Sequence, residues 1–414
     1  MHAIEEEQRY KINRILLLII GIWPYQRSIL AKVQRLFVCT ILASGICAEL
    51  SPFITHECST ALIIEVLSVI FPSLVVVIKY YYFNINAGII KQLFERVQAD
   101  WNLLKDKHER EIIKSYTEYW RLITIFTILL SCCMLIIYVT SPITLYIINV
   151  YLSNNNTYSQ YIYIPINYSV NQEKYIYVIL LHFIVFFCVG LLIIVAVATF
   201  IGLYMKHACG LLKIASYRIE HAINMENVQQ VSLLKREYVM YLRIIRAVDI
   251  QQKALKFTNR VMSTFALMYF ALIVLGAAGV SVNMFRFLKN LQTNRDWCEL
   301  FIILSVLIGN FLYMFLANNL AQEISDHCND VFYAAYNSMW YVAPLRVQKS
   351  VLFLLQYGTK NFTIILGGFF VSSLEGFATV MSIDTKYIFV LLYGNLLYAN
   401  ERQKNGEISI LKYP

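Results

Sequence analysis

Charged side chains are scarce in this 414-residue chain. Asp, Glu, Lys and Arg make up 15% of the residues and 58% are hydrophobic, whereas soluble domains carry roughly 25% charged residues. The mean hydropathy is +0.57. The net charge of +9 does not indicate nucleic-acid binding, because the basic residues lie in the segments between the apolar runs. This composition excludes an ordinary soluble protein and predicts an all-α integral membrane protein that binds no nucleic acid.

Proline and glycine are also scarce, with 7 and 15 residues, which argues against low-complexity linkers. The 9 cysteines form no CxxC pair and no cysteine–histidine ligand spacing. Cys58 and Cys298 fall in short loops on one side of the predicted bundle, so a disulfide between them stays open. No cleavable signal peptide is evident, because Pro24 and Tyr25 follow the short apolar stretch Arg14–Trp23. That stretch is interpreted as an interfacial or re-entrant element.

Long apolar runs, in contrast, are frequent. A membrane-spanning helix needs about 20 such residues, and seven runs are long enough. They are Leu36–Ile54, Ala61–Phe83, Leu122–Val150, Tyr175–Met205, Val261–Val282, Leu300–Leu316 and a last run from about Asn361 to about Leu392. Ser141-Pro142 should end or kink the third helix. No internal repeat is visible, which argues against an inverted-repeat transporter.

The orientation of the bundle follows from its basic residues. Most of the 35 Lys and Arg residues lie in the N-terminal segment and in the connections after the second, fourth and sixth spans. Such residues stay in the cytosol, which predicts a cytosolic N-terminus and, after seven crossings, an extracellular C-terminus. The glycosylation signals at Asn155 and Asn167 fall in a connection predicted to lie outside, which agrees with this orientation.

Two of the cytosolic connections have helical patterns of their own. Ala87–Tyr119 and Cys209–Arg260 carry apolar residues at helical spacing among charges, as at Ile214, Ile219 and Ile223. A cytosolic layer of packed helices is preferred over independent amphipathic helices on the membrane surface. The predicted organisation is an N-terminal segment (1–34), spans one to four (35–205), a cytosolic helical extension (206–260), spans five and six (261–316), a cytosolic segment (317–360), span seven (361–392) and a tail (393–414).

The last apolar run, IILGGFFVSSLEGFATVMSI, carries a polar stripe. Ser372, Glu375, Thr379 and Ser382 are spaced three, four and three apart, so on a helix they share one face. Gly368, Ser372 and Gly376 would add a ladder of small residues, which allows close helix packing. A carboxylate at membrane depth is costly, so Glu375 should face protein or water. The stripe is therefore either a packing seam or the lining of a water-filled path.

Three stretches resemble the insect odorant receptor family. AAYNSMWYVAPLRVQKSVLFLLQYGTK (Ala334–Lys360) is similar to the family's last cytosolic loop, and LGGFFVSSLEGFATVMSI (Leu366–Ile383) to its final helix. INRILLLIIGIWPYQ (Ile12–Gln26) resembles its apolar-Trp-Pro opening. The general layout matches over most of the chain.

The resemblance implies a ligand-gated, nonselective cation channel of four subunits. This chain would be a tuning subunit that assembles with a shared co-receptor subunit (Orco), and Trp340 and Tyr341 would lie in the subunit contact. The seventh helix would line the pore, with Tyr387 and Val390 near its outer gate. Gly394 and the tail after Leu392 depart from the family pattern. The implied location is the plasma membrane of olfactory sensory neuron dendrites.

No family motif marks the ligand pocket, so its placement is inferred from chemistry. A small volatile molecule needs a mostly apolar cleft with a few polar groups, which the outer halves of the helices offer. Candidates there are Val66, Ile70, Phe71, Tyr138, Thr140, Tyr146, Tyr177, Leu181, His182, Phe186, Phe301 and Ser305. The alternative is that each is an ordinary residue of the bundle core.

Three other functions compete with an odorant-gated channel. A G-protein-coupled receptor would need the opposite orientation, and the chain lacks both an acidic-Arg-aromatic triplet at the cytosolic end of span three and Asn-Pro-x-x-Tyr in span seven. An enzyme would need converging catalytic groups, but His182 is the only histidine within a span, so neither catalysis nor a cofactor is expected. A gustatory receptor would share the architecture, and the Trp340-Tyr341 loop favours the odorant branch.

Overall fold

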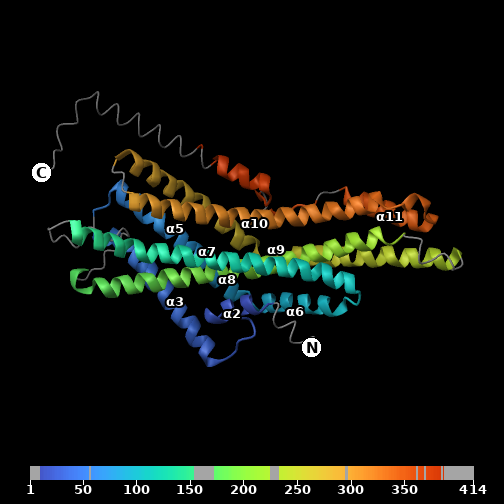
Figure 1. Cartoon of the computed structure of the whole chain (residues 1–414), viewed down its shortest axis with the longest axis horizontal. Coiled ribbons are helices and arrows are strands. Elements are labelled where there is room, and N and C mark those ends of the chain that lie inside the picture. Colours follow the sequence, from blue (N-terminus) through green and yellow to red (C-terminus); the bar gives the residue numbers. More distant parts are fainter. Residues whose placement is uncertain are drawn as a thin grey trace, which may run out of the picture.

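Long helices run side by side along one axis of the protein (Figure 1). The computed structural model describes residues 10–55, 57–152, 172–223, 233–293, 297–359, 362–367, 370–383 and 386. Its elements are α2 (Lys11–Ile19), α3 (Ile29–Leu50), α4 (Pro52–Thr55), α5 (Thr60–Ile85), α6 (Ala87–Leu103), α7 (Lys107–Leu152), α8 (Gln172–Glu220), α9 (Leu233–Thr293), α10 (Trp297–Asn337), η2 (Trp340–Val342), α11 (Leu345–Gly358), β1 (Ile365–Leu366) and β2 (Phe370–Val371). A short apolar helix, Leu374–Ile383, follows β2.

Six of the described helices are long and apolar enough to cross a membrane. They correspond to the first six predicted spans, which confirms the all-α, polytopic fold class. α7 continues past Ser141-Pro142 to Leu152, so of the two expected effects of this pair the helix end does not occur.

Four helices are much longer than a bilayer requires. α7, α8, α9 and α10 contain 46, 49, 61 and 41 residues, whereas a span needs about 20. Their extensions pack with α6 and α11 at one end of the bundle (Figure 1). Ile214, Ile219 and Ile223 are buried there, as their spacing predicts, so these extensions form a packed layer rather than separate surface helices.

The N-terminal apolar stretch is tucked against this bundle. α2 has only 9 residues, too few to span, and its Leu17 is fully buried. Gly21 adopts a φ of +73°, which only glycine tolerates easily, and turns the chain toward α3. The hydroxyl of Tyr80 on α5 donates a hydrogen bond to the carbonyl of Ile20 at 3.2 Å. α2 is therefore packed on the bundle and too short to span, and its interfacial or re-entrant position stays a prediction.

The start of the seventh segment differs from the expected helix. Ile365–Leu366 and Phe370–Val371 pair as an antiparallel hairpin, and its turn begins at Gly367, whose φ is +61°. Ser373 then accepts a hydrogen bond from the backbone N–H of Gly376 at 3.0 Å, as an N-cap residue does. The helix therefore begins at Leu374 rather than near Asn361, so Ser372 precedes it. Gly368 lies outside the described residues.

One glycine allows α7 and α8 to pack closely. A Cβ at Gly202 would lie 2.0 Å from Cζ2 of Trp120, and the Trp120 indole donates a hydrogen bond to the carbonyl of Thr199 at 2.8 Å. The bulky ring thus fits only because position 202 has no side chain.

Gly202→Ala should therefore lower the thermal unfolding temperature of the purified protein in detergent, by a destabilisation of about 1–3 kcal/mol from overpacking. Gly309→Ala is the matched control, because a Cβ there meets no atom within 4 Å. It should be neutral or stabilising, since alanine favours helix by up to about 1 kcal/mol. Equal effects of the two substitutions would contradict the packing described.

Candidate ligand-binding site

A mostly apolar cavity of about 170 Å³ lies between α3, α5, α7, α8, α9 and α10. Its lining residues on α7 and α8 belong to the later part of α7 and the first half of α8. Its lining is Glu49, Ser68, Val69, Pro72, Ser73, Val76, Tyr138, Ile179, Leu180, Phe183, Phe186, Phe187, Gly190, Leu191, Ile194, Asn283, Arg286, Glu299, Ile302, Ile303 and Val306. An engineered cavity of about 150 Å³ holds benzene, so this cavity suits one small molecule.

The apolar wall comes chiefly from one face of α8. Phe183, Phe187 and Gly190 recur at spacings of four and three, which places them on the same side of the helix. The Phe187 ring stacks on Tyr138 of α7 with centroids 4.2 Å apart. Phe186 packs so closely on α3 that a Cβ at Gly45 would lie 2.3 Å from its ring. The wall is thus fixed by two neighbouring helices.

Pro72 explains one polar contact of the cavity. Proline has no N–H, so the carbonyl of Ser68, one turn earlier in α5, loses its usual helical partner. The side-chain amide of Asn283 on α9 donates a hydrogen bond to that carbonyl at 3.2 Å. In a membrane such a freed carbonyl needs a protein partner, and this bond ties α5 to α9.

Arg286 organises a second group of polar side chains at the cavity. Its Nη2 donates to Oε1 of Glu299 at 2.7 Å, and its Nη1 donates to the Ser68 hydroxyl. Asn290 donates to the other oxygen of Glu299. Both oxygens of this carboxylate are therefore engaged within the protein.

Glu49 of α3 is the other carboxyl group in the lining, and it is only 4% exposed. Its Oε1 accepts a hydrogen bond from the Ser73 hydroxyl at 2.7 Å, while its Oε2 has no hydrogen-bond partner. The cavity therefore combines an apolar wall, one neutralised ion pair and one carboxyl oxygen that is not satisfied.

The structure brings two of the predicted ligand residues into this cavity, Tyr138 and Phe186. Ile70 and Phe71 belong to α5 but lie outside the lining, as does the buried Val66. Tyr177, Leu181 and Phe301 are more than half exposed, Thr140 is also exposed, and Ser305 is buried, its hydroxyl bonded to the Ile302 carbonyl. The side chain of Tyr146 lies outside the described residues.

His182 also points elsewhere, because its Nε2 lies 2.9 Å from the Ser44 hydroxyl of α3. The four helices chosen from the sequence, α5, α7, α8 and α10, all line the cavity, but the residues chosen on them mostly lie on neighbouring faces. α3 and α9 also line it and were not chosen. The polar residues Glu49, Asn283 and Arg286 were missed. For Glu49 the available signal was a charged side chain inside the apolar run Leu36–Ile54. Asn283 and Arg286 follow the end of the run Val261–Val282, so that signal was absent for them.

The predicted polar stripe of the last segment is divided. Ser372 precedes the helix and is buried, and its hydroxyl donates to Oδ1 of Asn318 on α10 at 3.1 Å. Glu375, Thr379 and Ser382 remain exposed on the helix Leu374–Ile383. Ser372 thus takes the role of a packing contact, while the other three side chains are not covered by the described chain. Tyr387 and Val390 lie outside the described residues.

Apolar side chains are exposed around the end of α10, η2 and α11. Tyr341 is 66% exposed and Trp340 is half-buried. Their exposed neighbours include Tyr336, Met339, Val342, Leu345 and Phe353. The residues expected at a subunit contact therefore lie in an uncovered apolar patch.

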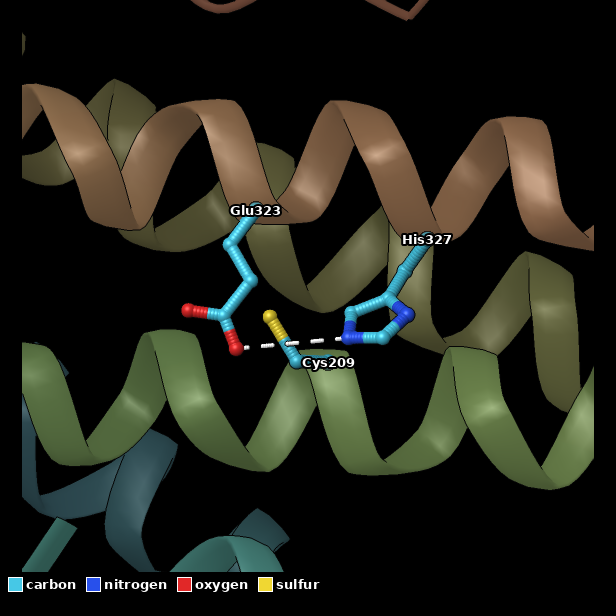
Figure 2. Close-up of side chains that lie close together, drawn as sticks. All are labelled: Cys209, Glu323 and His327. Carbon is cyan, nitrogen blue, oxygen red and sulfur yellow. Dashed lines mark ion pairs between the residues drawn. The ribbon is translucent and has the colours of Figure 1, made fainter. Parts of the chain in front are cut away.

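A further cluster joins α8 and α10 in the packed layer. Cys209, Glu323 and His327 point toward one another, and their ligand-type atoms lie within 4.8 Å (Figure 2). Both oxygens of Glu323, however, accept hydrogen bonds from Lys206, the first at 2.7 Å, and Lys206 is only 3% exposed. A metal ion would have to displace this buried ammonium, so the cluster is better described as an ion-pair network.

His327 extends this network to α7. Its Nε2 lies 2.9 Å from the Tyr116 hydroxyl and its Nδ1 3.1 Å from Oδ2 of Asp330. A neutral imidazole satisfies both contacts when Nδ1–H donates to Asp330 and Nε2 accepts from Tyr116. Three long helices are thereby joined by polar contacts inside an otherwise apolar layer.

Cys58 is a free, exposed cysteine in the structure, so the disulfide with Cys298 that the sequence left open is not seen at Cys58. The side chain of Cys298 lies outside the described residues.

Comparison with known proteins decides the family. A model described as 7tm Odorant receptor matches residues 59–383. The chain belongs to the odorant receptor family. The resemblance seen in the sequence is therefore confirmed, and this odorant receptor is grouped with receptors and channels rather than enzymes.

Solved structures agree with this odorant receptor in fold. The structure of the insect olfactory receptor OR5 from Machilis hrabei in complex with eugenol is 18% identical, with a TM-score of 0.78, and the match covers 94% of this chain and 99% of that one. The structure of the same receptor described without eugenol is 17% identical, with a TM-score of 0.77, and covers 94% and 98%. Among proteins of curated function, none matches this chain by sequence.

The Lys206–Glu323 pair should be important for the stability of this odorant receptor. Lys206→Met leaves a largely buried carboxylate without its cation, which should cost about 3 kcal/mol and lower the thermal unfolding temperature in detergent. Adding Glu323→Leu should recover most of the loss. Lys253→Met is the control, because its partner Asp249 is 58% exposed and exposed pairs contribute less than about 1 kcal/mol. A double variant as unstable as the single one would contradict this assignment.

Proposed function

We propose that this chain is the odorant-binding subunit of a ligand-gated, nonselective cation channel. A small volatile ligand would occupy the cavity between α3, α5, α7, α8, α9 and α10, and binding would favour the open arrangement of the bundle. The observation that carries this proposal is the cavity itself, an apolar site of suitable size with a few fixed polar groups. The eugenol complex of a protein with the same fold gives independent support.

Assembly with a shared co-receptor subunit is the second part of the proposal. The exposed apolar patch around Trp340 and Tyr341 supports it, because a patch of this kind is costly in water and is typical of protein contacts. In the proposed orientation the N-terminus and this patch face the cytosol of an olfactory neuron. The complex would be a heterotetramer in the plasma membrane, with the last helix of each subunit around one pore.

The pore lining is the third part of the proposal. Glu375, Thr379 and Ser382 recur at spacings of four and three, so they share one face of the helix Leu374–Ile383, and all three are exposed. A polar face that its own subunit does not cover suits a water-filled path between subunits. Tyr387 and Val390 would continue this path, with Val390 as part of a hydrophobic gate that closes by dewetting.

Co-expression with the co-receptor tests channel and cavity together. With G-protein signalling blocked, an odorant panel should evoke immediate cation currents. Gly190→Leu should remove or strongly reduce them, because Gly190 lines the cavity and a Cβ there only touches Val76 at 3.6 Å, so a larger side chain fills the space without a backbone clash. Gly309→Leu on α10 is the control, since position 309 lies outside the cavity in open space. Currents that require G-protein signalling would refute the channel, and full responses in Gly190→Leu would refute the cavity.

Single-channel conductance should distinguish the exposed polar face of the last helix from the buried Ser372. Glu375→Gln removes a negative charge that attracts cations, so single-channel conductance should fall roughly twofold or more. Ser372→Ala should leave conductance unchanged, because the Ser372 hydroxyl is bonded inside the subunit. Patch-clamp recording of both variants with surface expression measured decides between these roles. Unchanged conductance in Glu375→Gln would place this face away from the ion path.

A further inference from the structure

Glu49 has an unusual environment for a carboxyl group. It is 4% exposed, lies near the end of α3 and lines the candidate ligand cavity. Its Oε1 accepts the Ser73 hydroxyl at 2.7 Å, whereas its Oε2 has no hydrogen-bond partner. Among the ion pairs of the described residues, none includes Glu49. A buried acceptor without a partner is costly, so this oxygen is suited to a donor that arrives with a ligand.

The second carboxyl group of the cavity serves as an internal comparison. Glu299 receives hydrogen bonds on both oxygens, from Arg286 and Asn290. It therefore needs nothing from a ligand. The two groups have the same chemistry and line the same cavity, but only Glu49 has an oxygen left to bind a donor.

The remaining walls limit what can carry that donor. Phe183, Phe186 and Phe187 of α8 and Ile302, Ile303 and Val306 of α10 face the same space. They favour a small apolar body. A primary ammonium brings three N–H donors that all need acceptors, whereas a hydroxyl brings one. One unpaired carboxyl oxygen therefore matches a hydroxyl, whereas the other N–H groups of an ammonium would face apolar side chains.

We infer that Glu49 selects small apolar volatiles that carry a single hydroxyl group, which donates its hydrogen bond to Oε2. This inference rests on the proposed function of the cavity and adds the chemical class of the ligand. Ethers of the same size and shape fill the same apolar space but leave Oε2 unsatisfied. They should bind less well for that reason alone.

Matched ligand pairs test the inference in cells that express the full chain with the co-receptor. The probes are hexanol with its isomer pentyl methyl ether, and benzyl alcohol with its isomer methoxybenzene. In the wild type the alcohol of an active pair should reach half-maximal current at about tenfold lower concentration, equivalent to about 1.4 kcal/mol. Glu49→Leu, which keeps an apolar side chain of similar size, should bring this ratio close to one.

Two further variants control for structural damage. Glu65→Leu makes the same exchange on α5, outside the cavity lining, and should keep the tenfold ratio. Glu49→Gln should give an intermediate ratio, because its carbonyl still accepts from an alcohol while its N–H can donate to an ether. If Glu49→Leu does not reach the cell surface, the alcohol-to-ether ratio of Glu49→Gln tests the inference instead.

The possible failures are distinguishable. An unchanged ratio in Glu49→Leu or Glu49→Gln, or equal responses to alcohol and ether in the wild type, would overturn the role of Glu49 while leaving the channel intact. A stronger response to hexylamine than to hexanol would overturn the choice of a hydroxyl. Silence toward both pairs together with responses to other volatiles would also overturn the inference. If no ligand of any kind evokes a current, the proposed function itself is refuted.

Discussion

A polar group inside an apolar bundle must find its partner within the protein, because lipid offers none. This constraint joins segments that lie far apart in the sequence. Asn13 of α2 donates to Thr199 of α8 at 3.0 Å, and Ser372 reaches Asn318 on α10. Lys79, which is 1% exposed, has no hydrogen-bond partner for its Nζ and instead lies 3.8 Å above the ring of Tyr313 as a cation–π contact. Where the constraint is met, the polar group fixes helix packing. The unsatisfied oxygen of Glu49 is therefore informative.

The helices were predictable from the sequence, but their rotation was not. Apolar run length determines which segments span, and the six described spans follow it. In α5 and α8, however, nearly every residue is apolar, so periodicity hardly distinguishes one face from another. A shift of one position turns a side chain by about 100° around the helix. Val69 and Leu180 line the cavity, whereas their neighbours Ile70 and Leu181 do not.

The seventh segment shows the opposite error. The spacing of Ser372, Glu375 and Thr379 fits a helix, and the prediction relied on that spacing. It did not use the local turn and capping signals in the same segment. Gly367 allows a left-handed turn residue, the Ile-Leu and Phe-Val pairs on either side favour strands, and Ser373 is a good N-cap. These signals are specific for a turn and a helix start. They locate the hairpin better than periodicity does, because a 3–4–3 pattern over eleven residues arises easily by chance.

In the proposed channel, the energy needed for gating limits what one hydrogen bond to Glu49 can contribute. Moving a two-state equilibrium from 1:99 to 99:1 requires about 10⁴-fold tighter binding to the open state. If a hydroxyl contributes about tenfold, roughly a thousandfold must come from apolar contact, which at about 25 cal/mol per Å² corresponds to about 160 Å². A molecule as small as benzyl alcohol has to be almost fully enclosed in one state and much less in the other. α10 is suited to make that difference, because one continuous helix carries Ile303 at the cavity, Asn318 at the hairpin and Glu323 in the ion-pair network. A small displacement of this helix would close the wall on the ligand and move the support of the last helix at the same time.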